Sequence, residues 1–415
     1  MSGGPAGPDI AIFLRNLAGG GIERVMLLLA GAFVQDGLAV ELIVGERRGA
    51  RADEVPAGVT LVELRPGSVA AGRLAALRAD PSGLPTLAAP VLLARKVAPT
   101  LAFLPGLARR LRAHPPRALL AATPFENLEA LRARRLTGGR FRVVLSEHNQ
   151  IDRSLIDSRE WSRRCLPALM RRAYPEAEAI VAVSNGVAEE IARLAALPRA
   201  RITTIYNPIV TPDLPGRAAG AVGEPWLAPG EPPVVMGAGR LVRQKDFPTL
   251  IRAFALARRQ RPMRLLIAGG ADTPASTAKR QAELMALAGE LGVAQEVRLT
   301  GHLADPLPLM ARAALFVLSS AWEGLGNVLV EAMACGTPVV STDCPSGPAE
   351  ILENGRHGRL VPVGDPAALA EAILATLTRP PDAASLRRRA QAFTVANAAS
   401  AYRALLLGEA GGGAR

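Results

Sequence analysis

Short apolar runs alternate with longer segments of helical periodicity along most of the chain. This alternation predicts parallel β-sheets whose strands are joined by crossover helices. In the first half, the runs that predict strands are residues 10–14, 39–44, 60–64, 118–122, 142–146, 179–183 and 202–206. In the second half, they are residues 234–237, 264–268, 296–300, 314–319, 338–342 and 359–361.

A stretch without periodicity separates the two halves. Residues 207–233 are rich in proline and glycine, which is typical of a linker. We therefore expect an α/β protein with two Rossmann-like, doubly wound domains that face each other across a cleft, each large enough to bury a core. The expected parts are an N-terminal domain at 1–210, a linker at 211–232, a C-terminal domain at 233–395, and a C-terminal helix with a disordered tail at 396–415.

The composition narrows the class of protein. Aromatic residues make up only 4% of the chain and hydrophobic residues 49%, so alanine, leucine and valine must build most of the interior. Three scattered cysteines are too few for a disulfide framework or a cysteine-rich zinc site, which favours a reducing compartment. No charged-then-apolar leader precedes the first strand, so we expect a cytoplasmic protein.

The formal net charge of +12 has two interpretations. Nucleic acid is not expected as a partner, because aromatic residues that could stack on bases are scarce. Residues 71–117 mix arginines with apolar residues but contain no uninterrupted apolar span of about 20 residues, so a transmembrane helix is not expected there. Peripheral contact with the anionic inner face of the cell membrane is one interpretation of this region. The other is a compositional preference for arginine, since lysine occurs only at positions 96, 245 and 279.

Two glutamates eight positions apart, Glu323 and Glu331, form the most informative motif. The apolar run 315–319 predicts a buried strand, and residues 327–334 predict a helix that ends at Gly336. Glu323 is then expected in the strand-to-helix turn and Glu331 two turns into the helix. A glycine-bearing turn that opens a helix presents backbone N–H groups and a positive dipole end, which suit a phosphate.

Carboxylates on either side of an anion site favour the binding of hydroxyl groups. One carboxylate would bind a sugar at one end of the ligand, and the other would bind a ribose at the other end. The alternative is a structural strand–turn–helix with two surface acids. A wholly helical segment would separate the two carboxylates by on the order of 12 Å. Glycoside hydrolases need about 5 Å or roughly 6.5–9.5 Å, so we do not expect hydrolysis.

Two cations follow the first predicted strand of the second domain. Arg240 and Lys245 would lie at the carboxyl end of that strand, where they could neutralise a diphosphate. The alternative is a solvated, charge-rich loop. No Asp-x-Asp pair or histidine–carboxylate spacing indicates a metal site, so these cations and helix-end N–H groups would handle the charge of a leaving diphosphate without a metal ion.

The first domain has weaker candidates. Gly20 and Gly21 open a helix after the first strand and would let a ligand approach the backbone, although a tight turn is an equal alternative. An NAD site is not expected, because the glycine spacing differs from the dinucleotide motif and no acidic residue clearly ends the second strand, where Glu41 stands at the beginning. His148 ends another strand and could contact a sugar hydroxyl or merely cap a loop. Residues 345–350 are expected to form a loop of unassigned role at the edge of the second sheet.

Together these residues resemble the family-four retaining glycosyltransferases of GT-B fold, the glycosyltransferases group 1 type. The resemblance covers nearly the whole second domain and is looser in the first. In the second domain it is carried by residues 239–246, 323–331 and 334–340. In the first domain it is carried by residues 181–187 and 205–208 and, more loosely, by 20–24 and 147–149.

The resemblance implies a role for each candidate. Glu331 would bind the ribose hydroxyls and Glu323 would contact the donor sugar. Arg240 and Lys245 would hold the diphosphate, and His148 would lie beside the donor sugar. The contacts to the nucleotide sugar would come from Glu331, Gly324, Leu325, Gly326, Asn327, Val328, Gly20 and Gly21.

The implied activity is transfer of a hexosyl or N-acetylhexosaminyl group with retention of configuration, without a metal, a separate cofactor or a protein nucleophile. The expected donor is a UDP-sugar, with GDP-sugars as the alternative. The expected acceptor is a glycan or lipid-linked acceptor of surface polysaccharide or lipopolysaccharide assembly, with a soluble acceptor as the alternative. The chain departs from the family at Gly326-Asn327, where Phe/Gly or Pro/Asn combinations are common, and this could loosen the turn.

Two other functions are compatible with this layout. A catalytically silent protein would bind the nucleotide sugar and transfer nothing. A non-hydrolysing sugar-nucleotide epimerase would change the donor without any acceptor, and it would need acid and base groups at the sugar. The combination of two cations and two spaced glutamates favours transfer.

Overall fold

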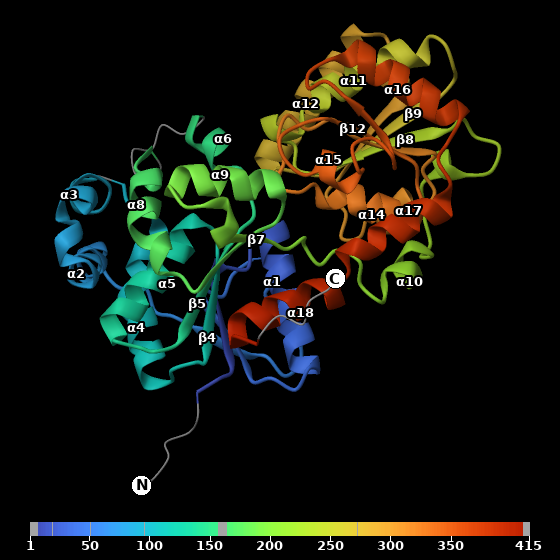
Figure 1. Cartoon of the computed structure of the whole chain (residues 1–415). Coiled ribbons are helices and arrows are strands. Elements are labelled where there is room, and N and C mark those ends of the chain that lie inside the picture. The colour runs from blue at the N-terminus through green and yellow to red at the C-terminus, as the bar shows by residue number, and fades with distance from the viewer. Residues whose placement is uncertain are drawn as a thin grey trace. The chain divides into compact units, whose positions relative to one another are not determined.

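The computed structural model describes residues 7–409, apart from residues 19, 50, 95, 157–163 and 272 (Figure 1). The chain divides into two compact units, Met1–Pro208 together with Val395–Arg415, and Ile209–Thr394. Gly19 of the glycine-rich turn and the tail 411–415 lie outside the described residues.

The first unit is built on a parallel sheet of seven described strands in the order β3-β2-β1-β4-β5-β6-β7. The order reverses between β1 and β4, which is the doubly wound arrangement that the alternation predicted. β4 is apolar along its whole length and β1 is apolar as far as Leu14, because helices cover both faces of a parallel sheet. The strands are β1 (Ile10–Asn16), β2 (Val40–Glu46), β3 (Thr60–Glu63), β4 (Ala118–Ala122), β5 (Arg142–Glu147), β6 (Ala179–Ala182) and β7 (Ile202–Thr204).

Helices from distant parts of the sequence cover this sheet. The last described helix, α18 (Val395–Leu407), lies beside α1 in the first unit, and its residues Tyr402 and Leu406 belong to the same core as Phe33 of α1 (Figure 1). The unit is therefore completed by residues that follow the whole second unit in the sequence. Its other helices are α1 (Gly21–Gln35), α2 (Val69–Ala79), α3 (Leu84–Leu87), α4 (Leu104–Ala113), α5 (Pro124–Thr137), α6 (Ile151–Ile156), α8 (Leu166–Ala173) and α9 (Asn185–Ala195).

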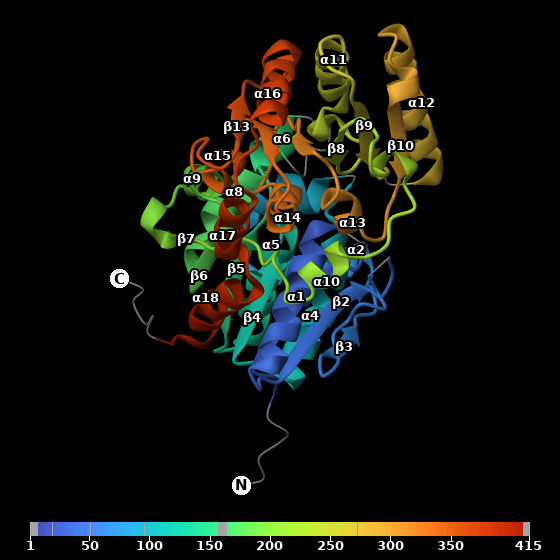
Figure 2. The ribbon, with the colours of Figure 1, turned by 90° about the vertical axis from the view of Figure 1, so that its right-hand side faces the viewer.

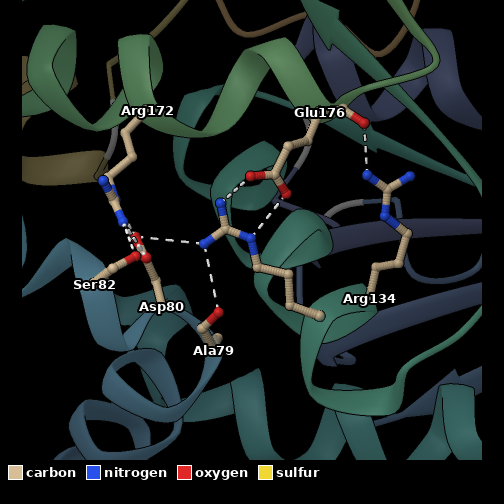
Figure 3. A network of polar contacts seen from close by, with 7 residues as sticks. Ala79, Asp80, Ser82, Arg134, Arg172 and Glu176 are labelled. Atoms are coloured by element: carbon tan, nitrogen blue, oxygen red, sulfur yellow. Dashed lines mark hydrogen bonds and ion pairs between the residues drawn. The ribbon is translucent and has the colours of Figure 1, made fainter.

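A network of ion pairs fixes the segment that follows α2 (Figure 3). Asp80 lies between two arginines of other helices: Arg172 Nη2 is 2.5 Å from Asp80 Oδ1, and Arg135 Nη1 is 3.4 Å from Asp80 Oδ2. Arg172 also donates to Ser82 Oγ at 2.7 Å, and Arg135 donates to Glu176 Oε2 at 2.8 Å. The hydrogen bond from Arg172 holds the pKa of the Asp80 carboxyl below its usual value. The basic, apolar segment of the sequence is thus tied to α5 and α8.

The second unit repeats the arrangement with a parallel sheet of six described strands in the order β10-β9-β8-β11-β12-β13. Here the order reverses between β8 and β11, so the carboxyl ends of these two neighbouring strands mark the expected ligand edge. The strands are β8 (Val234–Ala238), β9 (Arg264–Ala268), β10 (Val297–Gly301), β11 (Leu315–Leu318), β12 (Val339–Thr342) and β13 (Arg359–Val361).

Long helices cover the second sheet, and Figure 2 shows α16, α11 and α12 side by side. Buried side chains of α11 and α16 share one core with the sheet, for example Phe254 and Ile373. The helices of this unit are α10 (Leu214–Ala218), α11 (Phe247–Arg258), α12 (Pro274–Glu290), α13 (Leu307–Met310), α14 (Asn327–Cys335), α15 (Pro348–Ile351), α16 (Pro366–Thr378) and α17 (Ala383–Ala390).

Two details differ from the sequence prediction. The linker contains the helix α10 and a 3-10 turn, Pro225–Leu227, whose Trp226 ring lies 4.0 Å from the guanidinium of Arg298 and 5.0 Å from that of Arg264. The prediction that no acidic residue ends the second strand was wrong, because β2 continues past the apolar run to Glu46. Pairing with β1 extends it, as Asn16 lies opposite Glu46.

Candidate active site

The turn between β11 and α14 is held by the loop that follows β12. Glu323 N donates to Pro345 O at 2.9 Å, and Ser346 N donates to Glu323 O at 3.1 Å. Gly347 has a φ of 95°, and a Cβ at that position would lie 2.0 Å from Leu325 O. Only glycine fits this close approach. The loop 345–350, to which the sequence assigned no role, therefore fixes the backbone of Glu323 and Leu325.

Glu323 forms a buried ion pair with Lys245. Lys245 Nζ lies 2.5 Å from Glu323 Oε1, and Ser320 Oγ donates to the same oxygen at 2.6 Å. The side chains of Glu323 and Lys245 are only 7% and 14% exposed. Removing one partner of such a pair leaves the other charge buried and uncompensated. Ser320 was not among the predicted site residues, although it lies only three positions before Glu323.

The position of Lys245 follows from local backbone contacts. Gly239 has a φ of 151°, and a Cβ there would lie 3.0–3.3 Å from three carbons of the Lys245 side chain. The lysine stem therefore passes over a residue that has no side chain. Ser319 Oγ donates to Lys245 O at 2.8 Å and ties this loop to the end of β11. The carboxyl ends of β8 and β11 are thus joined at the point where the strand order reverses.

Arg240 differs from Lys245. Its side chain is exposed, and within the described part of the chain its guanidinium makes no hydrogen bond or ion pair. Lys245 and Glu323 neutralise each other, whereas no described carboxylate pairs with Arg240. One positive charge therefore remains exposed at this edge.

Helix α14 starts at Asn327 after Gly326, which has a φ of 101° and offers no side chain to cap the first turn. Glycine adopts this left-handed conformation without strain, so the departure from the family pattern fits the turn. Gly324 and Leu325 are buried, and Asn327 and Val328 form the start of the helix. Glu331 is the fifth helical residue and lies little more than one turn inside α14, so the prediction of two turns was wrong.

In the first unit, His148 follows β5 and is buried. Its Nε2 lies 2.8 Å from Ser146 Oγ, which in turn lies 2.7 Å from Tyr402 Oη of α18. Burial lowers the pKa of His148 to about 4, and the Asn207 side chain offsets only part of this effect. The imidazole is therefore neutral at neutral pH, and it can share hydrogen bonds without carrying a charge. Tyr402 is 256 positions from Ser146, so nothing local in the sequence indicates this contact.

The residue before His148 is a buried acid. Glu147 Oε1 accepts hydrogen bonds from the Tyr174 phenol and, at 2.8 Å, from Asn127 Nδ2. Burial raises the pKa of Glu147 to about 8, and the nearby carboxylates of Glu190 and Glu126 act in the same direction. Glu147 therefore holds a proton at neutral pH.

The glycine-rich turn of the first unit lies at the same edge as His148. Gly20 precedes α1 and Gly21 is its first residue. A Cβ on Gly20 would lie 2.5 Å from Glu23 Oε2, so the Glu23 carboxylate bends back over this turn. The end of β4 completes the edge, since Thr123 N donates to Ser146 O at 3.1 Å. Gly20, Gly21 and His148 thus occupy the carboxyl edge of the first sheet, as Arg240, Lys245 and Glu323 do in the second.

None of the described helices combines the length and the apolar character needed to cross a bilayer. In the same part of the chain, no three histidine, cysteine or acidic side chains come together in a way that could hold a metal ion.

Two family models match the chain in the places where these edges lie. The model "Glycosyltransferase Family 4" matches residues 19–212, and the model "Glycosyl transferases group 1" matches residues 232–379. The chain belongs to the family-four, group 1 glycosyltransferases. His148 falls within the first match, and Lys245, Glu323 and Glu331 fall within the second.

Relatives of known name match about half of the chain. The lipopolysaccharide core biosynthesis glycosyltransferase LpsE of Rhizobium meliloti is 34% identical over 200 residues, which are 48% of this chain and 54% of LpsE. An N-acetylgalactosaminyltransferase of Campylobacter jejuni that acts on a diphospho-undecaprenol-linked saccharide is 31% identical over 195 residues, 47% of this chain and 49% of that protein. The chain thus spans about half the length of these relatives.

Solved structures confirm the predicted GT-B fold. The structure of Anabaena HepE in complex with UDP and glucose matches with a TM-score of 0.73 and 21% identity, and it covers 96% of this chain and 98% of HepE. Sucrose-phosphate synthase from Thermosynechococcus elongatus matches with a TM-score of 0.74 and 20% identity, over 96% of this chain and 99% of the synthase. At these identities the likeness concerns the fold.

Proposed function

We propose that this member of the family is a retaining, metal-independent glycosyltransferase that moves a hexosyl or N-acetylhexosaminyl group from a UDP-sugar to an acceptor. The Lys245–Glu323 ion pair carries the proposal, because it places a cation and a carboxylate together at the switch point of the second sheet. That edge is where a doubly wound sheet binds its ligand.

The residues at this edge account for the parts of the reaction. Lys245 and Arg240 would neutralise the leaving diphosphate, with the start of α14 as a further source of positive potential. Glu323, held by Ser320, would accept hydrogen bonds from the hydroxyls of the donor sugar. Glu331 would bind the ribose. Retention would follow if the acceptor attacks from the side of the leaving group, with the diphosphate receiving the acceptor proton.

The relatives support the substrate classes. HepE was solved with UDP and glucose, which supports a UDP-sugar donor. The names of LpsE and of the Campylobacter transferase support an acceptor in lipopolysaccharide assembly or on a diphospho-undecaprenol carrier. Either acceptor is a glycan or a lipid-linked saccharide.

Calorimetry with nucleotide diphosphates tests the proposal. We expect UDP to bind with a micromolar dissociation constant in EDTA, GDP and ADP to bind more weakly, and Glu331→Ala to weaken UDP binding. If GDP bound more tightly than UDP, the donor would be a GDP-sugar. A requirement for a divalent metal would contradict the metal-independent mechanism. The anomeric configuration of the product, read by NMR, decides retention. UDP binding without transfer to any saccharide acceptor would indicate a silent binder, and conversion of the donor sugar alone would indicate an epimerase.

We also propose peripheral contact with an anionic membrane through the segment after β3. Large apolar side chains are exposed there, and basic side chains of the same segment are exposed with them. The exposed apolar residues are Val69, Leu74, Leu84 and Leu93, with exposed fractions of 45%, 48%, 47% and 76%. The exposed basic residues are Arg78, Lys96, Arg109 and Arg112.

Co-sedimentation with phosphatidylglycerol vesicles tests this contact. Leu93→Asp is expected to lower the vesicle-bound fraction severalfold, because it puts a carboxylate where the most exposed apolar side chain stood. The matched control is Val363→Asp in the second unit, at a side chain that is 41% exposed. If both variants and the wild type bound the vesicles equally at low salt, the proposed membrane contact through this segment would be wrong.

A further inference from the structure

The turn that carries Glu323 is tied to the loop that carries Lys245 by more than their ion pair. Ala321 N donates to Gln244 O at 2.8 Å, and Gln244 Nε2 donates to Trp322 O at 2.9 Å. Both segments belong to the second unit. Hydrogen bonds from both sides thus hold the backbone around Glu323, so its side chain starts from a defined place.

Ser320 is fully buried in the same turn, and both its hydroxyl and its carbonyl are engaged. The hydroxyl Oγ donates to Glu323 Oε1 at 2.6 Å. The carbonyl accepts a hydrogen bond of 2.6 Å from Thr342 Oγ1, at the end of the neighbouring strand β12. The main chain of Ser320 is therefore fixed by β12, and its hydroxyl reaches Glu323 from a fixed position.

The two oxygens of the Glu323 carboxylate have different surroundings. Oε1 accepts from Lys245 Nζ at 2.5 Å and from Ser320 Oγ at 2.6 Å. Because a carboxylate oxygen has two lone pairs, these two donors fill Oε1. Within the described part of the chain, the hydrogen bond to Oε2 is a long one, 3.5 Å from Gln244 Nε2. Oε2 therefore keeps most of its capacity to accept a hydrogen bond from a ligand.

We propose that Ser320 is a positioning residue for Glu323, which occupies Oε1 together with Lys245 and leaves Oε2 to bind one hydroxyl of the donor sugar. The inference rests on the proposed function, in which Glu323 accepts hydrogen bonds from that sugar. Without the Ser320 hydroxyl, Oε1 keeps only the contact with Lys245, and the carboxylate is free to turn about that contact. The sugar then meets a carboxylate in several orientations instead of one.

This role predicts which part of the ligand is affected. A carboxylate accepts hydrogen bonds but donates none, so the group that faces Oε2 must be a donor, as a sugar hydroxyl is. UDP lacks the donor sugar and has no such group at that place. Loss of the Ser320 hydroxyl should therefore weaken the binding of a UDP-sugar and leave the binding of UDP unchanged. General loosening of the turn would instead weaken both, because the same turn holds Lys245, the proposed diphosphate ligand.

Calorimetric titration of UDP, UDP-glucose and UDP-N-acetylglucosamine against the full chain tests the inference. For the UDP-sugar that the wild type binds more tightly, Ser320→Ala is expected to raise the dissociation constant about tenfold. The dissociation constant of UDP should stay within about twofold of the wild-type value. Ser320→Cys keeps a side chain of similar size with a weaker donor, so its affinity for the UDP-sugar should lie between those of the wild type and Ser320→Ala.

Ser341→Ala is the matched control. Ser341 is a fully buried serine of β12, and its hydroxyl donates to the carbonyl of Thr342 at 2.8 Å instead of to a carboxylate. This variant loses one buried hydroxyl from the same sheet without changing the contacts of Glu323. Its dissociation constants for UDP and for the UDP-sugar should both stay within about twofold of the wild-type values.

Each other outcome has a defined meaning. Wild type that does not bind UDP would overturn the proposed function, and the inference with it. Wild type that binds UDP, together with unchanged affinity of Ser320→Ala for both UDP-sugars, would overturn the inference alone. An equal loss for UDP and the UDP-sugar, or the same selective loss in Ser341→Ala, would also overturn it. If thermal melts show that Ser320→Ala does not fold, Ser320→Cys decides: it must weaken the UDP-sugar more than UDP, and unchanged or equally weakened affinities would reject the role.

Discussion

Replacing Lys245 with alanine is expected to lower the rate of sugar transfer by at least roughly 100-fold while the protein stays folded. Lys245 is the partner of Glu323 and is proposed to face the leaving diphosphate, so one substitution removes the cation that meets both negative groups. The kcat for transfer from a UDP-sugar, measured beside the far-UV circular dichroism spectrum, checks this result. Glu323→Ala should cause a comparable loss, because it removes the carboxylate proposed to bind the donor sugar and leaves Lys245 without its partner.

Stability separates the structural effect from the catalytic one. Lys245→Ala leaves the buried Glu323 carboxylate with Ser320 but without its cation, which should lower the free energy of unfolding by about 3 kcal/mol. The double variant Lys245→Met/Glu323→Gln removes both charges and should regain most of this stability without regaining activity. Lys279→Ala, at an exposed lysine of α12, is the control. Residual activity above about a tenth of wild type in Lys245→Ala would show that this lysine does not stabilise the leaving group.

Glu147→Gln is expected to make the protein more stable than the wild type above neutral pH. The pKa of this buried carboxyl is raised from 4.5 to about 8, so the folded state keeps a proton that the unfolded chain releases. Wild-type stability should therefore fall as the pH rises from about 4.5 to about 8, by up to about 1.4 kcal/mol per pH unit, and level off above that. Glutamine keeps the acceptor for Tyr174 and Asn127 but cannot ionise.

Urea denaturation between pH 5 and pH 9 measures this effect. The difference in unfolding free energy between Glu147→Gln and the wild type should grow steadily with pH and reach a plateau above about pH 8. Glu189→Gln provides the control, since the Glu189 side chain is 68% exposed and pairs with Arg199 on the surface. Parallel pH profiles for Glu147→Gln and the wild type would mean that Glu147 is ionised in the folded protein at neutral pH.

The strands of this fold could be predicted because buried parallel strands are unbroken apolar runs. The sequence indicated β4, β9 and β13 with the bounds that the structure has. Helix α10 was missed, because five residues with a proline and a glycine carry no periodicity. Its position depends on packing against α13 and α14, which are far away in the sequence. Tertiary contact, not local propensity, sets this element.

The candidate site was predictable as separate motifs but not as an arrangement. Glu323 and Lys245 each stood out by residue type and by place at a strand end. Their ion pair joins loops 78 positions apart, which no local pattern reveals. Ser320, which donates to Glu323, had no signal in the sequence, because serine is common on protein surfaces. The buried pair of Glu147 and Tyr174 was also missed, because the sequence alone does not show which polar side chains become buried in the folded chain.

The place of α18 has a consequence for the order of events during synthesis. This helix supplies Tyr402 and Leu406 to the core of the first unit, yet the ribosome makes it only after all of Ile209–Thr394. Part of the core of the first unit therefore stays uncovered until α18 has been synthesised. The described strands of the second unit are all made before that helix. The contact between Tyr402 and Ser146, next to His148, is among the last that the nascent chain can form.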